Sequence, residues 1–258
     1  MGEGMSVESV FDKDAGIGRL VLNHPPLNIL TRAVMGEMRE KLAELQAEKS
    51  LRVVVMQAEG KHFSVGADVG EHTPPEYEEL IPEFIDTIAA IYNFPLPVIA
   101  AVQGRCLGGG FEVVQAADIV IAGEGALFGQ PEIVLGVLPP AACALLPVLC
   151  DPGLAAELVL TGEAIGAGEA AAAGLVRYVV PDDQVEAKAF DIAGQMAKHS
   201  AAALRQTKRA LRAGSAGRVN DALNEVGRIY VEDLMSTRDA VEGLQAFLEK
   251  RAPTWSHE

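Results

Sequence analysis

Residues 97–122, PVIAAVQGRCLGGGFEVVQAADIVIA, contain a complete structural unit. The run from Pro97 to Val102 is continuously apolar, which is typical of a buried strand. Gly108 to Gly110 open a helix, and Ile119 to Ala122 form a further short strand. Strand, helix and strand in this order indicate a βαβ unit, whose two strands run parallel. The stretch therefore predicts an α/β fold with a mostly parallel sheet.

The chain before this stretch alternates in the same way. Ile17 to Leu22 and Val53 to Met56 have the apolar pattern of strands, and Glu76 to Asn93 has the pattern of a helix. Thr31 is placed to cap an earlier helix, because threonine at the N-cap accepts a backbone hydrogen bond from the first turn. The apolar residues of that helix recur at helical spacing: Val34, Met38, Leu42 and Leu45.

The second half of the chain has a different pattern. From about Leu154 it predicts helix after helix, with few helix breakers between Asp182 and Lys250. We divide the chain into a core domain, residues 1–195, and a helical C-terminal region, residues 196–258, that packs on the core or on a neighbouring subunit. The last helix is expected to have one apolar face, made of Ala240, Leu244, Phe247 and Leu248.

Composition and charge exclude several classes of protein. The chain has 258 residues, 49% apolar and 22% charged, as in ordinary globular proteins, and a formal net charge of -15. That charge repels nucleic acid, so nucleic acid is not expected as a partner. No apolar run reaches the length of a membrane span, and Met1 to Asp14 does not resemble a signal peptide. We expect no membrane association and a cytoplasmic location.

Two further features of composition bear on possible ligands. The cysteines Cys106, Cys143 and Cys150 are few and lack metal-ligand spacing, so we expect reduced thiols and no metal site. Between Lys198 and Arg251 ten basic residues outnumber seven acidic ones. This stretch is positive enough to meet a small anionic ligand, although solvated helix faces explain the same pattern.

Three short segments have residue types suited to chemistry. In Phe63–Asp68, FSVGAD, small residues allow backbone N–H groups to approach a ligand, although a plain turn fits too. Gly108–Glu112, GGGFE, exposes free N–H groups at the positive end of a helix, where a developing oxyanion is stabilised. In Phe128–Glu132, FGQPE, Pro131 restricts the backbone and presents Glu132 on a rigid turn, although a solvated loop is the simpler interpretation.

Glu112 and Glu132 together indicate acid–base chemistry. Glu112 lies in the first turn of the expected helix, where a carboxylate is also a favourable partner for the helix dipole. Two carboxylates that converge on one substrate are driven to different pKa values by burial and mutual repulsion. Such a pair can deliver a hydroxyl group and a proton to adjacent carbons.

In their order and spacing, these three segments resemble the crotonase, or enoyl-CoA hydratase/isomerase, superfamily. The resemblance continues through Leu160–Gly162, Ala173–Val176 and Phe247–Arg251 and covers essentially the whole chain. It implies a crotonase-like ββα superhelical core, a helical C-terminal trimerisation region, and a homotrimer or a dimer of trimers. It also implies an acyl-CoA substrate, so that coenzyme A enters as a thioester and no separate cofactor is needed.

The resemblance also assigns roles to individual residues. The backbone N–H groups of Ala67 and Gly109 match the oxyanion hole, and Glu112 and Glu132 match the catalytic glutamates of the water-adding members. Lys250 matches a basic residue that reaches the CoA phosphates of an adjacent subunit. The full set of residues expected to bind substrate is Val65, Gly66, Ala67, Asp68, Gly108, Gly109, Pro139 and Lys250.

The chain departs from the common family pattern at two places. Gly70 occupies the position of a lysine that contacts CoA, and Pro139–Ala144 replaces a glycine-rich loop near the acyl end of the site. With His72, Pro26–Asn28 and Asp239–Gly243, these departures resemble the cyclohexa-1,5-diene-1-carbonyl-CoA hydratases of anaerobic benzoyl-CoA breakdown. The alternatives are a general 2-enoyl-CoA hydratase, an enoyl-CoA isomerase, and a non-catalytic acyl-CoA-binding or RNA-binding relative.

Overall fold

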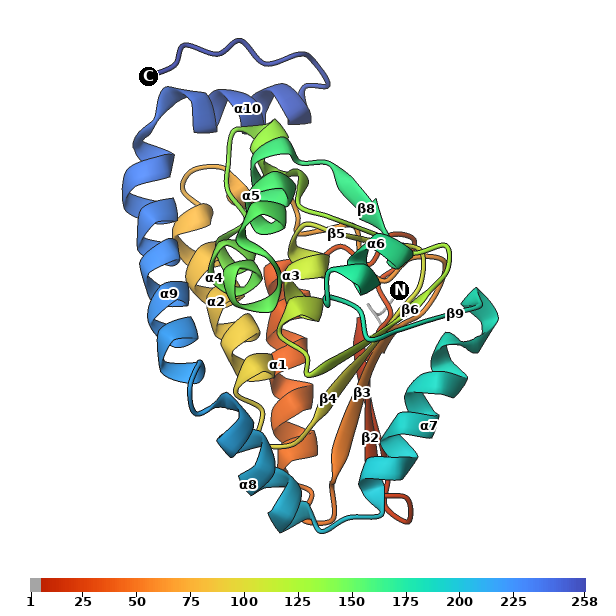
Figure 1. Cartoon of the computed structure of the whole chain (residues 1–258). Helices are drawn as coiled ribbons and strands as arrows, with labels where there is room; N and C mark the ends of the chain where they lie inside the picture. Colours follow the sequence, from red (N-terminus) through yellow and green to blue (C-terminus); the bar gives the residue numbers. More distant parts are fainter. Residues whose placement is uncertain (1–5) are drawn as a thin grey trace, which may run out of the picture.

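The centre of the molecule is a six-stranded sheet in the order β1-β2-β3-β4-β6-β9. The computed structural model describes residues 6–258 (Figure 1). β1 is antiparallel to β2, and every other neighbouring pair is parallel, as the sequence predicts. The strands are β1 (Val7–Asp12), β2 (Ile17–Leu22), β3 (Val53–Ala58), β4 (Val98–Val102), β6 (Ile119–Gly123) and β9 (Tyr178–Val180).

The sequences of the middle strands, β3 and β4, are mostly apolar because helices cover both faces of the sheet there. Every residue of β3 and β4 is buried. Alternate side chains, such as Val53 and Ile99, pack on α7 (Val185–Ala197), and the others, such as Val54 and Val98, face the main core. Figure 1 shows α7 on one side of the sheet and α1 (Arg32–Ala47) and α2 (Tyr77–Tyr92) on the other.

A second, three-stranded sheet lies beside the first, in the order β5-β7-β8. Its strands, β5 (Arg105–Leu107), β7 (Leu127–Gly129) and β8 (Ala164–Gly166), are three residues long. β5 and β7 are parallel, with Leu107 opposite Gly129. The chain therefore leaves both strands at the same edge, into α3 (Gly109–Gln115) after β5 and into the 3₁₀ turn η2 (Pro131–Leu135) after β7.

The second half of the chain is mostly helical, as its sequence pattern predicts. It also contains two short strands, β8 and β9, which the helical pattern after Leu154 does not predict. The remaining helices are α4 (Pro140–Leu149), α5 (Pro152–Thr161), α6 (Ala167–Ala172), α8 (Ala201–Arg212), α9 (Ala216–Arg228) and α10 (Arg238–Leu248). A π-helical turn (Ile229–Asp233) and a 3₁₀ turn (Leu234–Ser236) connect α9 to α10.

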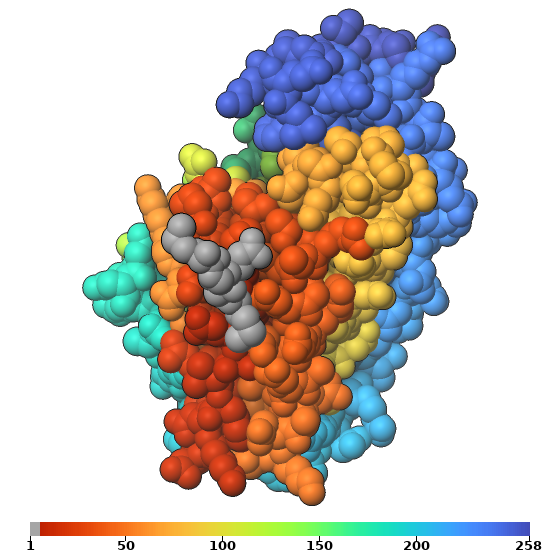
Figure 2. Space-filling model, turned by 180° about the vertical axis from the view of Figure 1, so that it is seen from behind, coloured from red at the N-terminus to blue at the C-terminus, as the bar shows by residue number. Residues whose placement is uncertain are grey.

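The C-terminal helices share the apolar core of the rest of the chain. Val219, Leu223 and Leu244 are buried in the same cluster as the strands. The prediction of one apolar face on α10 is confirmed for Ala240 and Leu244, which are buried. Phe247 and Leu248 are instead 53% and 49% exposed. Figure 2 shows α10 and the C-terminal segment, in dark blue, at one end of the molecule beside the orange-yellow surface of α2. The division at residues 195 and 196, and an oligomeric role for the second part, remain predictions.

Hydropathy along the helices bears on membrane association. Within residues 6–258, none of the helices combines the length and the apolar character needed to cross a bilayer.

The N-cap of α1 confirms the sequence prediction. The Thr31 hydroxyl oxygen accepts a hydrogen bond from the backbone N–H of Val34 at 3.2 Å. We expect Thr31→Ala to lower the free energy of unfolding by about 1 kcal/mol, because a helix N–H loses its partner. Urea unfolding with an unchanged m value measures this loss. Thr31→Ser keeps the oxygen and should restore most of the stability, and equal stability of the Ala variant and the original protein would contradict the capping role.

Candidate active site

A cavity of about 310 Å³ lies at the edge where β5 and β7 end. Apolar side chains make most of its wall, with α2, α4 and α10 on its sides. Five of the residues expected to bind substrate line it together with both glutamates: Val65, Gly66, Ala67, Gly108, Gly109, Glu112 and Glu132. Three segments far apart in the sequence therefore meet at one site, as their resemblance to the family implies.

The segment around Ala67 is held by backbone contacts on both sides. Ser64 forms a β-bridge with Cys106 of β5, and Ala67 forms one with Leu30. The Ser64 hydroxyl donates to the Asn28 carbonyl oxygen at 2.7 Å. Gly66 has φ +121°, a conformation that side-chain-bearing residues rarely adopt. The backbone is thus fixed as it enters the cavity.

Ala67 and Gly109 present backbone N–H groups close together. A Cβ atom at position 109 would lie 3.3 Å from the Ala67 nitrogen and 3.3 Å from the Phe84 ring, so only glycine leaves this space open. Within residues 6–258, neither N–H group donates to a protein acceptor. Gly109 is the first residue of α3, where N–H groups lack partners within the helix. Two such donors side by side have the arrangement that stabilises an oxyanion.

Glu112 is buried in the first turn of α3, with its side chain directed at the start of α4. Its Oε1 accepts hydrogen bonds from the N–H groups of Ala141 at 2.6 Å and Ala142 at 2.9 Å. Burial raises the pKa of Glu112 to about 7, and the two N–H donors oppose that rise because they stabilise the charged form. Glu112 is therefore the better supported anion of the pair.

Glu132 lies in η2, directly after β7. The residue as a whole is partly exposed, but its Oε2 is completely buried and has no hydrogen-bond partner among residues 6–258. A Cβ atom on Gly108 would approach Oε1 to 2.6 Å, so a larger residue at this position would require the carboxylate to move. Burial, and then the negative charge of Glu112, raise the pKa of Glu132 well above its ordinary value. Burial and the charge of Glu112 therefore favour the protonated form of Glu132.

Three of the residues expected to bind substrate do not line this cavity. The Asp68 carboxylate accepts a hydrogen bond from the Glu71 N–H at 3.2 Å, at the start of the 3₁₀ turn η1 (Gly70–His72). Pro139 precedes α4, and its neighbour Pro140 lines the cavity instead. Lys250 is exposed just beyond α10. Contacts of these three residues with substrate stay predictions.

His72 lines the cavity, although the sequence identified it only as part of the subfamily pattern. Its ring Nδ1 lies 2.7 Å from the Asp68 carbonyl oxygen, and because a carbonyl only accepts, Nδ1 carries the proton. Burial lowers the pKa of His72, so the ring is neutral and Nε2 is an acceptor. The sequence offered no spacing signal for a lone histidine on a loop.

The apolar wall comes from residues that the sequence indicates only as helix core. Leu80, Ile81 and Phe84 of α2 face the cavity, and Leu244 and Phe247 of α10 close another side. Their helical spacing is the pattern of any buried helix face, so it did not mark them as site residues.

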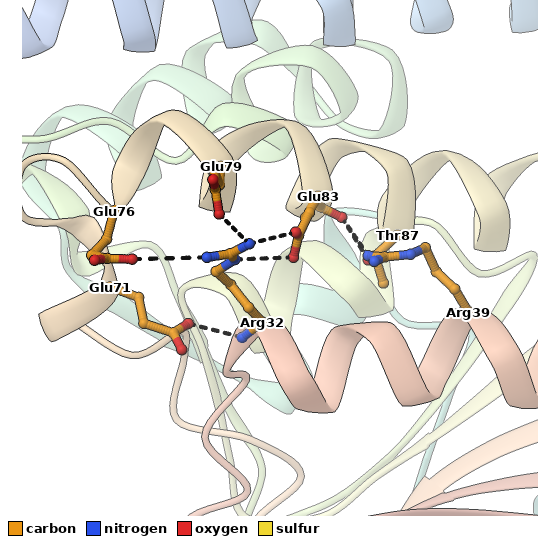
Figure 3. Close-up of polar contacts among 7 residues, drawn as sticks. All are labelled: Arg32, Arg39, Glu71, Glu76, Glu79, Glu83 and Thr87. Atoms are coloured by element: carbon orange, nitrogen blue, oxygen red, sulfur yellow. Dashed lines mark hydrogen bonds and ion pairs between the residues drawn. The ribbon is translucent and has the colours of Figure 1, made fainter.

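Ion pairs around Arg32 tie the cavity wall to α1 (Figure 3). Its guanidinium lies 2.6 Å from a Glu79 carboxylate oxygen and 2.8 Å from one of Glu83, both on α2. Its backbone N–H donates to the Glu71 carboxylate of η1 at 2.8 Å. The start of α1 thus holds both the turn that carries His72 and the helix that supplies the apolar wall.

The described part of the chain contains no arrangement of three or more His, Cys, Asp or Glu side chains able to hold a metal ion. The donors that converge on the cavity are two backbone N–H groups and two carboxylates. Such a set can polarise a carbonyl oxygen and transfer protons on carbon and water.

This fold and this site define a family. The chain belongs to the enoyl-CoA hydratase/isomerase family, whose model matches residues 12–258. It is an enzyme of the enoyl-CoA hydratase type, a hydro-lyase. A crystal structure of an enoyl-CoA hydratase/isomerase from Pseudoalteromonas atlantica has a TM-score of 0.88 and 30% identity, covering 97% of this chain and 100% of that one.

Two curated relatives have more specific names. The cyclohexa-1,5-dienecarbonyl-CoA hydratase of Thauera aromatica is 39% identical over 259 residues, which cover 100% of both chains. The 2,3-dehydroadipyl-CoA hydratase of Escherichia coli is 34% identical over 249 residues, which cover 95% of this chain and 97% of that one. Expected membership of this family is confirmed.

The buried glutamates make stability depend on pH. The pKa of Glu132 is raised above its ordinary value of 4.5 on folding, so the unfolded chain loses this proton first as the pH rises. Stability therefore falls with increasing pH between the two pKa values, by about 1.4 kcal/mol per pH unit for one group. We expect Glu132→Gln to unfold near the original temperature at pH 5 and several degrees above it at pH 8, as measured by thermal unfolding.

The exposed Glu157 of α5 provides the control for this comparison. Glu157→Gln removes the same charge at the surface and should change the midpoint little at either pH. A Glu132→Gln variant that gains no more stability at pH 8 than Glu157→Gln would show that burial does not penalise the Glu132 carboxylate.

Proposed function

We propose that this enzyme adds water across a C=C bond conjugated with a CoA thioester, with the N–H groups of Ala67 and Gly109 holding the carbonyl oxygen. Glu112 acts as the base and Glu132 as the acid. The observation that supports this most is the pairing of two buried carboxylates in unequal surroundings next to two free N–H groups in one apolar cavity.

The unequal surroundings assign the two proton transfers. Glu112 accepts two backbone hydrogen bonds that favour its anion, so it is suited to take a proton from water. As the water oxygen bonds to one alkene carbon, electron density moves into the conjugated thioester, where the two N–H groups stabilise the oxyanion. Glu132, whose protonated form is favoured, then donates its proton to the other carbon. The atoms of one water molecule are thereby added, and a final proton exchange restores the pair.

We propose cyclohexa-1,5-diene-1-carbonyl-CoA as the substrate. The support is full-length identity of 39% to a hydratase named for that thioester, compared with 34% to a hydratase of an open-chain acyl group. The wall of the cavity is mainly apolar and includes Pro140, which suits a compact hydrocarbon ring. A general 2-enoyl-CoA hydratase is the alternative. An isomerase would move protons without incorporating oxygen, so labelled water separates it from both.

The proposal also covers the oligomeric state of the enzyme, its cofactor and its location in the cell. We expect a homotrimer or a dimer of trimers, in which the exposed Lys250 contacts the CoA phosphates bound by an adjacent subunit. Coenzyme A enters only as the thioester, and no other cofactor takes part. The three cysteines are free thiols, which suits a reducing cytoplasm.

The glutamate roles predict a loss of turnover without a loss of fold. Glu112→Gln and Glu132→Gln keep the shape of the side chain and remove proton transfer, so each should lower kcat by about 10²- to 10⁴-fold. Hydration of enoyl-CoA thioesters with ¹⁸O-labelled water measures both turnover and oxygen incorporation. Glu157→Gln, at the surface, should keep full activity. Near-normal turnover in both buried variants would rule out this mechanism.

The proposed substrate predicts a ratio of specificities. We expect kcat/KM for cyclohexa-1,5-diene-1-carbonyl-CoA to exceed that for crotonyl-CoA by at least about 10-fold, or ~1.4 kcal/mol of transition-state stabilisation. Some crotonyl-CoA activity should remain, because apolar pocket fit discriminates by only ~1–3 kcal/mol per methylene. The reverse ratio would assign the enzyme to the general hydratases and leave the glutamate roles in place.

A further inference from the structure

Tyr230 lies on the π-helical turn between α9 and α10 and is completely buried. Its ring centre is 6.3 Å from that of His72, a residue of the cavity wall. π-Helical turns are rare and occur frequently at functional sites, because they change the direction of side chains at a cost in backbone regularity. The unusual turn thus places a phenol directly behind the active-site wall.

The Tyr230 hydroxyl has no hydrogen-bond partner within residues 6–258, although it is fully buried. Burying an unpaired hydroxyl is unfavourable, and phenylalanine would fill the same space without that cost. Among the same residues, Oε2 of Glu132, an acceptor at the cavity, is also completely buried and without a hydrogen-bond partner. A donor and an acceptor are therefore both left unpaired in this part of the protein.

Tyr230 lies close enough to the glutamate pair for the charges of both carboxylates to act on its hydroxyl. Burial raises the pKa of Tyr230, and the negative charges of Glu132 and then Glu112 raise it further. The phenol is consequently a neutral O–H donor in the field of the two carboxylates. No positive charge contributes to this shift.

Two polar side chains near the glutamates, His72 and Cys143, are poor donors toward them. The His72 Nδ1 proton is already donated to the Asp68 carbonyl oxygen. Burial and the two glutamates raise the pKa of Cys143 on α4 to about 12, so its thiol is a weak neutral donor. The residues that α2 contributes to the wall are apolar: Leu80, Ile81 and Phe84.

We propose that Tyr230 is a positioning residue for the glutamate pair, whose O–H orients toward Glu132 and stabilises its anion once Glu132 has given its proton to the substrate. This inference rests on the proposed acid role of Glu132. The proton transfer creates a negative charge in an apolar cavity, where an oriented O–H dipole is worth more than in water. No bond to Tyr230 is made or broken, and the phenol keeps its proton throughout.

Tyr230→Phe tests this role through three measurements. With whichever enoyl-CoA thioester the original enzyme hydrates faster, kcat should fall about 10- to 100-fold, the worth of a hydrogen bond to a charged group, while KM changes less than about 3-fold. The basic limb of the kcat/KM profile should move to higher pH, because the Glu132 anion loses a stabilising donor. The melting temperature of the unliganded protein should stay the same or rise.

Tyr92→Phe is the matched control. Tyr92 is also buried, but its hydroxyl pairs with the Ser215 hydroxyl at 3.3 Å and lies outside the cavity. We expect this variant to keep the original kcat and pH profile. Placing 3-fluorotyrosine at position 230 provides an independent test, because its more acidic hydroxyl is a stronger donor and should move the basic limb to lower pH.

An unchanged pH profile for Tyr230→Phe, with a lower melting temperature, would overturn the inference and make Tyr230 a packing residue. An unshifted limb with fluorotyrosine would overturn it even if the Phe variant failed to fold. The glutamate variants separate this failure from that of the proposed function. If Glu112→Gln and Glu132→Gln lose activity while Tyr230→Phe behaves like Tyr92→Phe, only the role of Tyr230 is wrong.

Discussion

The parallel pairing of β5 with β7 is the constraint on which the site depends. The two strands are short, but their register places the start of α3 and the start of η2 at one edge. The bridge from Ser64 to Cys106 brings a third segment alongside them. Any slip in this pairing would move Glu112, Glu132 and the two free N–H groups relative to one another. The six-stranded sheet forms the main apolar core, and the three-stranded sheet determines the distances between the active-site groups.

The site places two carboxyl groups, those of Glu112 and Glu132, in an apolar cavity where two negative charges are unfavourable. Backbone N–H groups stabilise the two carboxylates unequally. The N–H groups at the start of α4 stabilise the Glu112 carboxylate, whereas Oε2 of Glu132 has no hydrogen-bond partner among residues 6–258. The surroundings therefore favour the anion at Glu112 more than at Glu132. The difference originates in the position of α4, which follows the turn of Glu132 in the sequence and reaches back to Glu112.

The sequence predicts the long buried strands and the capped first helix because each has a local signature, and the resemblance to the family predicts that the three motifs meet. Val53–Met56 and Pro97–Val102 are apolar runs long enough to recognise. Strands of three residues, such as β5, β7 and β9, carry no periodicity and depend on partners far along the chain. His72 and Tyr230 were missed as neighbours for the same reason, since only tertiary packing brings them together. Phe247 was expected on the apolar face of the last helix, but it is half exposed at the cavity.

The cavity is enclosed by residues from nearly the whole length of the chain. Val65 and Ala67 contribute one side, and Leu244 and Phe247 of α10 contribute another. During synthesis the large sheet, α3 and both glutamates leave the ribosome well before α10 does. The cavity that holds the reactive groups is therefore closed only when the last helix docks. Because water weakens electrostatic stabilisation, the enzyme should become competent only at the end of folding, when its final residues exclude the solvent.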